Sequence, residues 1–326
     1  TPQGSTGTRS YEFAKKLTQA GHKVTMVCGR NQMANSGASS DYVKNIRKTT
    51  VEGFEVIEIN VPYSNHDNFW SRVKKFCYFS CKSSQLSLTR KYDLIFCTTT
   101  PLTVGIPGIL AKVFRRKKFM FEVRDLWPEL PKAMGAIKNP VILGLMGLLE
   151  KISYKSADHL IGLSPGIVEG IKKVAPKKKV ALIPNGCDID FFSNVTPLDS
   201  LDGFSKTDFV AVFTGAHGPA NGLNAVLDVA KYLKVKNECD IKFLFVGDGK
   251  EKPDLVKRSE SEGLDNCIFW STLPKTKLAR VLKTVDLGLM ILKNIPAFYY
   301  GTSPNKFFDY IAAGLPVLNN YPGWLA

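Results

Sequence analysis

The chain has 326 residues, of which 44% are hydrophobic and 22% are charged, and its formal net charge at pH 7 is +15. This composition is typical of a globular protein with room for two domains and excludes a largely disordered chain. No apolar run approaches the eighteen or more residues that a membrane-spanning helix needs.

The positive charge is confined to the first half of the chain. Residues 1–187 carry 29 Lys and Arg against 13 Asp and Glu, a net of +16, whereas residues 188–326 carry 15 against 16. Such a half suits an anionic partner, either a membrane surface or a nucleic acid. The seven cysteines show no metal-ligand spacing with a nearby histidine, which predicts reduced thiols, no metal site and a cytoplasmic protein.

Short strand-like runs alternate with helix-like runs along the chain. We predict strands at residues 23–28, 54–59, 94–97, 118–123, 159–162, 180–184, 209–214, 241–246, 267–269, 286–292 and 316–318. This alternation predicts an α/β protein with parallel sheets. Between the sixth and seventh strands the sequence has no strong period and is interrupted by Pro, Gly and Asp. We therefore predict two similarly built domains, 1–190 and 191–326.

The first predicted helix follows directly on the loop GSTG, which contains Gly4 and Gly7. In a doubly wound domain such a loop follows a first strand, and none precedes it here. The chain also stops soon after its last predicted strand, so we expect both ends to be truncated. The loop could let a phosphate or sugar approach the backbone, but it lacks the G-x-G-x-x-G spacing, and a tight turn is an equal alternative.

Residues 69–91 combine aromatic side chains with six cations and no acid. Phe69, Val73 and Phe76 recur at helical spacing, with cations interleaved. The pattern is typical of a helix lying in a lipid interface and favours an anionic membrane surface as partner. A core-packed helix with a solvated face is the alternative. No nucleic-acid motif accompanies the charge, so we expect no nucleic-acid partner.

Polar residues follow two predicted strands of the first half. Arg124, Asp125 and Glu129 come after one strand in FEVRDLWPELP, and Asn185 comes after another in IPNGCD. Ligands of open α/β sheets bind at the carboxyl ends of strands, so these residues are candidates for a cleft. A local ion pair at Arg124 and Asp125, or a plain Asn-Gly turn, would have no functional role.

Two strands of the second half lead into glycine-rich loops. The first loop contains Gly215, His217, Gly218 and Asn221, and the second begins at Gly247. An uncovered glycine backbone is suited to a diphosphate. A lone histidine is more often structural, so His217 by itself is weak evidence.

The segment 298–318 joins a polar loop to an ordinary amphipathic helix. Ser303, Pro304 and Asn305 precede Lys306 at the helix start, and Asp309 follows one turn later. A carboxylate can accept hydrogen bonds from both ribose hydroxyls, while the helix N-terminus and a lysine favour phosphate. A sugar nucleotide needs all of these groups.

In this order the motifs resemble those of the retaining GT-B glycosyltransferases of family 4, in the branch that builds bacterial O-antigen and capsule. The likeness spans essentially the whole chain, through GSTGTRSYEFAKKLTQAGHKVTMVC, RDLWPE, LSPGI, IPNGCDIDFF, GDG and SPNKFFDYIAAGLPVL. It implies two Rossmann-like domains facing across a cleft, with the donor held mainly by the second and the acceptor by the first.

The resemblance also implies a reaction. The expected donor is a nucleotide-diphosphate sugar, UDP-linked and carrying an N-acetylated hexosamine or deoxyhexosamine. The expected acceptor is a polyprenyl-diphosphate-linked sugar at the inner face of the cell membrane. No dedicated protein nucleophile is expected, because the leaving diphosphate would itself deprotonate the incoming hydroxyl. No cofactor or metal is expected, since the sequence shows no obvious metal cluster. Arg124, Asp125 and Lys306 are the predicted catalytic residues, and Glu129 and Asn185 the predicted acceptor side of the cleft.

The sequence departs from the family pattern at several positions. Gly301 stands where many members have a glutamate, and Asp309 stands for a second one. The Arg and Lys that often grip the diphosphate correspond to His217 and Asn221. A histidine common in the first domain is replaced near residues 123–124. A sugar-nucleotide epimerase of GT-B-like fold and a non-catalytic sugar-nucleotide-binding protein are therefore the alternative functions.

Overall fold

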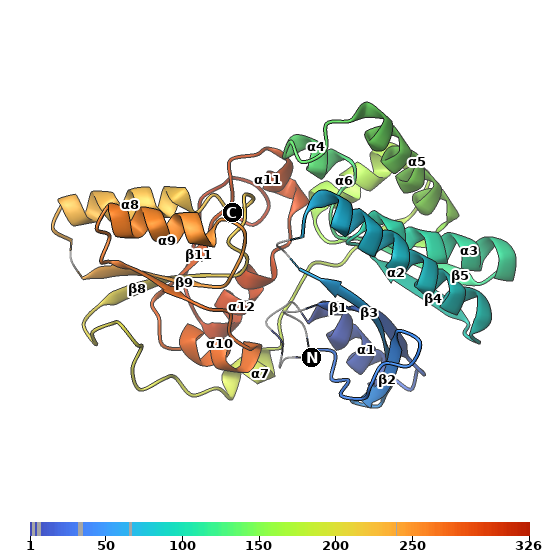
Figure 1. The fold of residues 1–326 in the computed structure, drawn as a ribbon, viewed down its shortest axis with the longest axis horizontal. Coiled ribbons are helices and arrows are strands. Elements are labelled where there is room, and N and C mark those ends of the chain that lie inside the picture. Colours follow the sequence, from blue (N-terminus) through green and yellow to red (C-terminus); the bar gives the residue numbers. More distant parts are fainter. Residues whose placement is uncertain (2–3, 5–7, 32–34, 65–66, 239) are drawn as a thin grey trace.

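The computed structural model describes residues 1, 4, 8–31, 35–64, 67–238 and 240–326, which form two α/β units (Figure 1). The strands of the first unit are β1 (Thr25–Asn31), β2 (Ile46–Val51), β3 (Phe54–Tyr63), β4 (Leu94–Thr98), β5 (Lys118–Val123), β6 (His159–Gly162) and β7 (Val180–Leu182). Its helices are α1 (Arg9–Gln19), α2 (Phe69–Thr89), the 3-10 helix η1 (Leu102–Val104), α3 (Gly105–Arg115), α4 (Glu129–Ala133), α5 (Pro140–Ser156) and α6 (Pro165–Val174).

The first unit contains two sheets. Strands β4, β5, β6 and β7 lie side by side in chain order and are all parallel. In the other sheet β3 lies between β1, its parallel neighbour, and β2, its antiparallel neighbour. The sequence analysis missed β2, whose residues IRKTTV are mostly polar and half-exposed and therefore give little apolar signal.

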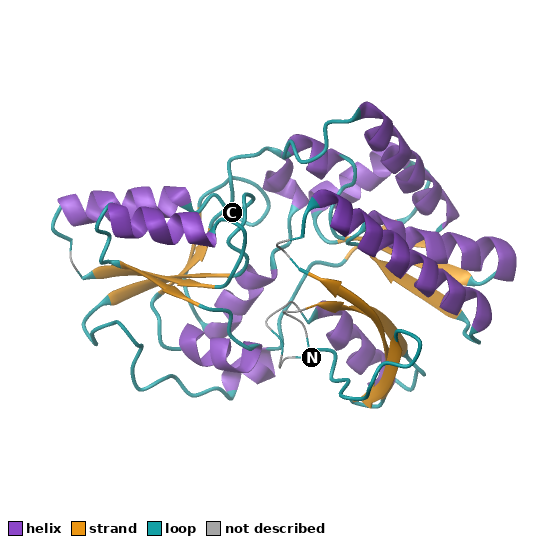
Figure 2. Ribbon diagram, in the orientation of Figure 1, coloured by secondary structure: helices purple, strands orange, loops and turns teal. Residues whose placement is uncertain are grey.

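The second unit is a single parallel sheet with helices on both faces. Its strands are β8 (Phe209–Thr214), β9 (Ile241–Val246), β10 (Cys267–Trp270), β11 (Leu287–Met290) and β12 (Val317–Asn319), in the order β10-β9-β8-β11-β12. Helices α8 (Asn224–Val235) and α9 (Lys252–Ser261) cover one face (Figure 2). The other face carries α10 (Lys275–Leu282) and α12 (Asn305–Ala313), and the short helices α7 (Ile189–Ser193) and α11 (Ala297–Gly301) complete the unit.

This strand order reverses between β8 and β11, because the chain runs from β8 outward to β10 and then returns to the other side of β8. The loops after β8 and β11 therefore diverge, and ligands of open α/β sheets bind at such a point. The two Rossmann-like units of the predicted GT-B fold are confirmed. Eleven predicted strands are present, and the connection between β7 and β8 contains the predicted division at 190 and 191. Phe192 of α7, within that connection, is buried in the core of the second unit, and the division itself remains a proposal.

Helix α2 packs against the rest of the first unit. A helix lying wholly in a lipid interface would not have this contact. Phe76 stacks on Tyr63 of β3 with ring centroids 5.8 Å apart, and the buried positions of the helix are Ser80, Ser84 and Ser87. Phe69 and Trp70 at its start remain exposed. Among the helices that the structure describes, none has the length and hydropathy of a membrane span.

Candidate active site

Helix α12 is fixed to the sheet at the point where the strand order reverses. Tyr310 is fully buried, and its hydroxyl accepts a hydrogen bond of 2.9 Å from the backbone N–H of Thr214, at the end of β8. This contact positions the first turn of α12, including Lys306, beside the loop that begins at Gly215.

The ammonium of Lys306 lies in a desolvated position beside β8. Its Nζ donates to Asn221 Oδ1 over 3.2 Å and lies 3.7 Å from the ring centroid of Phe213. Asn221 Oδ1 is its one hydrogen-bond partner among the residues described. Burial lowers the pKa of Lys306 from 10.5 to about 7. The structure thus brings together three predicted donor residues, Gly215, Asn221 and Lys306.

Asp309 lies one turn further along α12 and is paired with Lys275 at the start of α10. The Lys275 Nζ and Asp309 Oδ1 atoms are 3.0 Å apart, and both side chains are 14% exposed. Burial raises the pKa of Asp309, and Lys275 opposes that rise. A ribose binding to this carboxylate would have to share it with Lys275, which the sequence analysis did not identify.

His217 is buried in an aromatic cluster beside the loop that follows β8. Its ring packs against Phe213, Phe245 and Phe269, and its side chain is fully buried. Neither ring nitrogen has a hydrogen-bond partner within the described chain. Burial lowers the pKa of His217 to about 4, so the ring is neutral at pH 7. The ring thus has a structural environment in the free protein, and the predicted contact of His217 with the donor stays a prediction.

Gly247 brings two loops into close contact. A Cβ at Gly247 would overlap the carbonyl oxygen of Gly215, so only glycine permits this approach of the β8 and β9 loops. Gly218 has open space around it and remains accessible to a ligand. Gly4 is buried, and its carbonyl accepts a hydrogen bond of 3.1 Å from the Lys275 N–H of the second unit. The predicted residue Gly7 lies outside the described residues.

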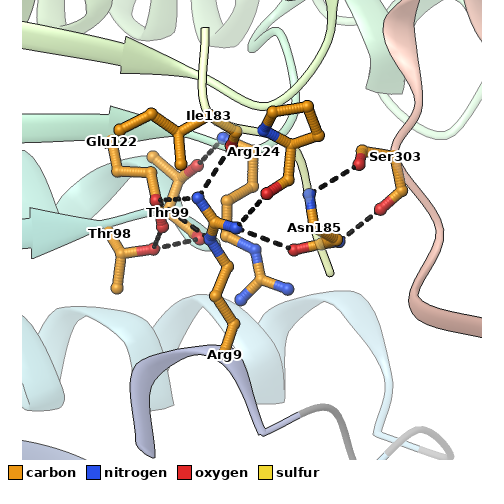
Figure 3. Close-up of polar contacts among 9 residues, drawn as sticks. Arg9, Thr98, Thr99, Glu122, Arg124, Ile183, Asn185 and Ser303 are labelled. Atoms are coloured by element: carbon orange, nitrogen blue, oxygen red, sulfur yellow. Dashed lines mark hydrogen bonds and ion pairs between the residues drawn. The ribbon is translucent and has the colours of Figure 1, made fainter. Parts of the chain in front are cut away.

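A buried ion pair joins α1 to β5 beneath the cleft (Figure 3). Arg9 Nη2 lies 2.8 Å from Glu122 Oε1, and the two side chains are 6% and 1% exposed. Glu122 also accepts a 2.6 Å hydrogen bond from Thr98 of β4. Arg9 further donates to the carbonyl oxygens of Ile183 and Pro184, so the ion pair fixes the chain that leaves β7.

This network continues across the two units. Arg9 Nη1 donates to Asn185 Oδ1 over 3.3 Å, and the Asn185 side-chain amide donates to the carbonyl oxygen of Ser303. The Asn185 backbone N–H donates to Ser303 Oγ over 2.9 Å. Two residues that the sequence analysis assigned to opposite sides of the cleft, Asn185 and Ser303, therefore bind each other. The loop before α12, which continues through Pro304 to the first helical residue Asn305, is thereby held against the first unit.

The RDLWPE segment supplies the polar groups of the first unit. Thr99 Oγ1 accepts a hydrogen bond from the Arg124 backbone, and Thr100 donates to Asp125 over 2.9 Å. Burial raises the pKa of Asp125. The Arg124 guanidinium has no hydrogen-bond partner in the part of the chain that is described, and it is half-buried. Glu129 is exposed at the start of α4.

Sequence reasoning missed Arg9, Glu122 and Lys275. Glu122 carried a signal, since a charged residue inside the strand KFMFEV must find a partner when that strand is buried. Arg9 and Lys275 carried none, because their partners lie far away in the sequence. No group of three or more His, Cys, Asp or Glu side chains among the described residues could hold a metal ion.

Family models match both units of this structure. Residues 4–186 match the glycosyl transferase 4-like domain, and residues 208–320 match the glycosyl transferases group 1. The chain belongs to the glycosyl transferase 4-like family. It is thus a glycosyltransferase with a GT-B-like fold, as the sequence motifs predicted. No curated protein sequence matches the chain.

Solved glycosyltransferase structures share the fold at low sequence identity. Sucrose-phosphate synthase from Thermosynechococcus elongatus aligns over 98% of this chain and 76% of its own, with 15% identity and a TM-score of 0.69. WaaG, a glycosyltransferase involved in lipopolysaccharide biosynthesis, aligns over 95% and 76%, with 15% identity and a TM-score of 0.61. Anabaena HepE in complex with UDP and glucose aligns over 83% and 69%, with 15% identity and a TM-score of 0.57.

Proposed function

We propose that this glycosyltransferase transfers a sugar with retention of configuration from a nucleotide-diphosphate donor to a polyprenyl-diphosphate-linked sugar. The donor is UDP carrying an N-acetylated hexosamine or a deoxyhexosamine, and the product belongs to a surface polysaccharide of the O-antigen or capsule type. The protein works as a peripheral protein at the cytoplasmic face of the cell membrane.

The environment of Lys306 carries this proposal. A desolvated ammonium whose one hydrogen-bond partner among the described residues is neutral is costly in the free protein, and a dianionic diphosphate would compensate it. Lys306 lies at the strand-order reversal and at the start of α12, where two independent features favour an anion. HepE, a structural neighbour, was solved with UDP and with UDP-glucose, which supports a uridine nucleotide.

In this mechanism the chain orients the substrates and stabilises charge. Lys306 holds the leaving diphosphate, and Arg124 approaches it from the first unit with a guanidinium that has no hydrogen-bond partner among the described residues. The diphosphate oxygen then takes the proton of the incoming hydroxyl on the same face of the sugar, while the acceptor oxygen bonds to the anomeric carbon and the bond from that carbon to the diphosphate breaks. Asp125 positions the acceptor together with Glu129.

We propose that the transfer needs no metal ion, because Lys306 and Arg124 supply the positive charge at the leaving group. Activity should therefore be unchanged in excess EDTA. The check is the initial rate with and without EDTA, followed by magnesium. A rate that vanished with EDTA and returned with magnesium would contradict this part of the mechanism.

Thermal unfolding with UDP, ADP, GDP and their sugars tests the proposed donor site. We expect saturating uridine nucleotides to raise the melting temperature by about 5 °C, since a ligand at a hundred times its Kd stabilises by ~2.7 kcal/mol. Asp309→Ala should lose most of this rise, because the variant lacks the carboxylate proposed to bind the ribose. Far-UV circular dichroism confirms that the variant folds. If the rise with uridine nucleotides were equal in both proteins, the assigned role of Asp309 would be wrong.

A further inference from the structure

Helix α5 exposes a continuous apolar stripe. The exposed fractions along it are 68%, 63%, 54% and 41%, at Val141, Leu145, Leu148 and Ile152. These positions are spaced by four, three and four residues and therefore share one face of the helix. We call this face the α5 stripe.

The α5 stripe is not needed for packing within the first unit. The opposite face of the helix already contributes Met146, Leu149 and the fully buried Tyr154 to the core beside β5. A surface helix whose inner face is packed normally has a polar outer face. Four large exposed hydrophobic residues in one line therefore indicate a surface that binds an apolar partner.

The positive charges around the α5 stripe indicate what kind of partner binds it. Lys151 and Lys155 lie on the same exposed face, and Lys138 is exposed just before the helix. None of these three lysines forms an ion pair with any residue that the structure describes. Residues 132–179 carry nine lysines against three acids. Of these acids Glu150 is buried and Asp158 is paired with Lys112, so the surface is cationic.

We propose that the α5 stripe docks the protein on an anionic lipid bilayer. Its apolar side chains would enter the acyl boundary while Lys138, Lys151 and Lys155 contact lipid headgroups. Figure 1 shows α5 at the outer edge of the first unit, with α4 between it and α11. This inference rests on the proposed function only in that docking here would bring a lipid-linked acceptor close to Glu129 at the start of α4.

The α5 stripe suits this role better than the segment 69–91 selected from the sequence. In α2 the ammonium of Lys75 is already held by Asp67, at 2.7 Å, and Phe76 packs on β3. The exposed aromatic residues of α2 are Phe69 and Trp70 in the first turn and Tyr78, at 36%, further along the helix. A helix that lies on a bilayer needs an apolar face along its length, and α5 provides one.

Sedimentation with vesicles of phosphatidylglycerol and phosphatidylcholine tests the docking surface, without donor or acceptor. The double variant Leu145→Ser with Leu148→Ser should bind the vesicles at least roughly tenfold more weakly than the native chain does. The reason is that these two leucines would be buried in the bilayer on binding and would contribute most of the apolar binding free energy. The matched control is Val229→Ser with Val235→Ser, two exposed residues of α8 in the second unit. It should bind like the native chain.

Each other outcome would overturn the proposal. Native protein that stays in solution with anionic vesicles would exclude docking on lipid, and equal binding of the Leu145 and Leu148 variant would exclude α5. If Lys74→Glu in α2 released the protein while the α5 variant did not, the docking helix would be α2. A concentration-dependent dimer that the α5 variant abolishes would make the stripe a protein interface. The vesicle experiment contains no nucleotide, so a negative result would not bear on the proposed donor site. That site is tested separately by the thermal shift with nucleotides.

Discussion

Replacing Arg9 with methionine should lower the free energy of unfolding by about 3–5 kcal/mol, because removal of one partner leaves a buried charge uncompensated. Glu122 would remain 1% exposed with only the Thr98 hydroxyl as a partner from the described network. The carbonyl oxygens of Ile183 and Pro184 would also lose their donor. Urea unfolding at constant slope measures the change.

Lys16→Met is the matched control for Arg9→Met, since Lys16 is exposed on the same helix. It should change the free energy of unfolding by less than about 0.5 kcal/mol. The double variant Arg9→Met with Glu122→Leu should recover part of the loss, because both charges are then removed. A cost below about 1 kcal/mol for Arg9→Met would show that the network does not hold the two units together as described.

Lys306→Met should have opposite effects on the free and the nucleotide-bound protein. It should stabilise the free protein by about 1–3 kcal/mol at pH 6, because a desolvated ammonium with one neutral partner is replaced by an apolar chain of similar shape. The Phe213 ring offsets part of the cost of the native ammonium. The same variant should weaken UDP binding roughly 10–100-fold, since a charge-assisted hydrogen bond is lost.

The stability difference between Lys306→Met and the native chain should depend on pH, and the pKa of Lys306 gives the sign of this dependence. The folded pKa of Lys306 is lowered to about 7, so the unfolded chain binds more protons between pH 7 and the unfolded value. Native stability should therefore rise with pH across this window, and the advantage of Lys306→Met should shrink from pH 6 to pH 10. Thermal unfolding at both pH values measures it, with the exposed Lys250→Met as control. A variant less stable than the native chain at pH 6 would contradict the desolvated ammonium.

Most strands of the fold could be predicted from the sequence, because buried parallel strands are short apolar runs that are easy to recognise locally. Runs such as FVAVFT in β8 and IKFLFV in β9 are mostly apolar, and each is followed by a glycine. Strand β2 was missed because most of its residues are polar and therefore give no clear alternation of apolar and polar side chains. The glycine-rich loop after a predicted strand indicated Gly215 and Asn221, and the segment 298–318 indicated Lys306; the structure brings these three residues together.

The contacts between distant segments could not be predicted from the sequence. Arg9 and Glu122 are more than a hundred residues apart, and nothing in their local patterns relates them. The contacts that His217, Gly247 and Asn185 make with distant segments were missed for the same reason. Each lies in a loop after a strand, where a ligand contact and a contact with a neighbouring loop have the same sequence pattern.

The most direct test of the proposed activity is to incubate the protein with a UDP-sugar and a polyprenyl-diphosphate-linked sugar and follow both substrates by mass spectrometry. We predict that UDP is released only when the lipid is present and that the lipid gains the mass of one sugar residue. A change of the sugar on UDP without acceptor would instead indicate an epimerase. Intact substrates across the whole donor panel would contradict catalysis and leave a sugar-nucleotide-binding protein.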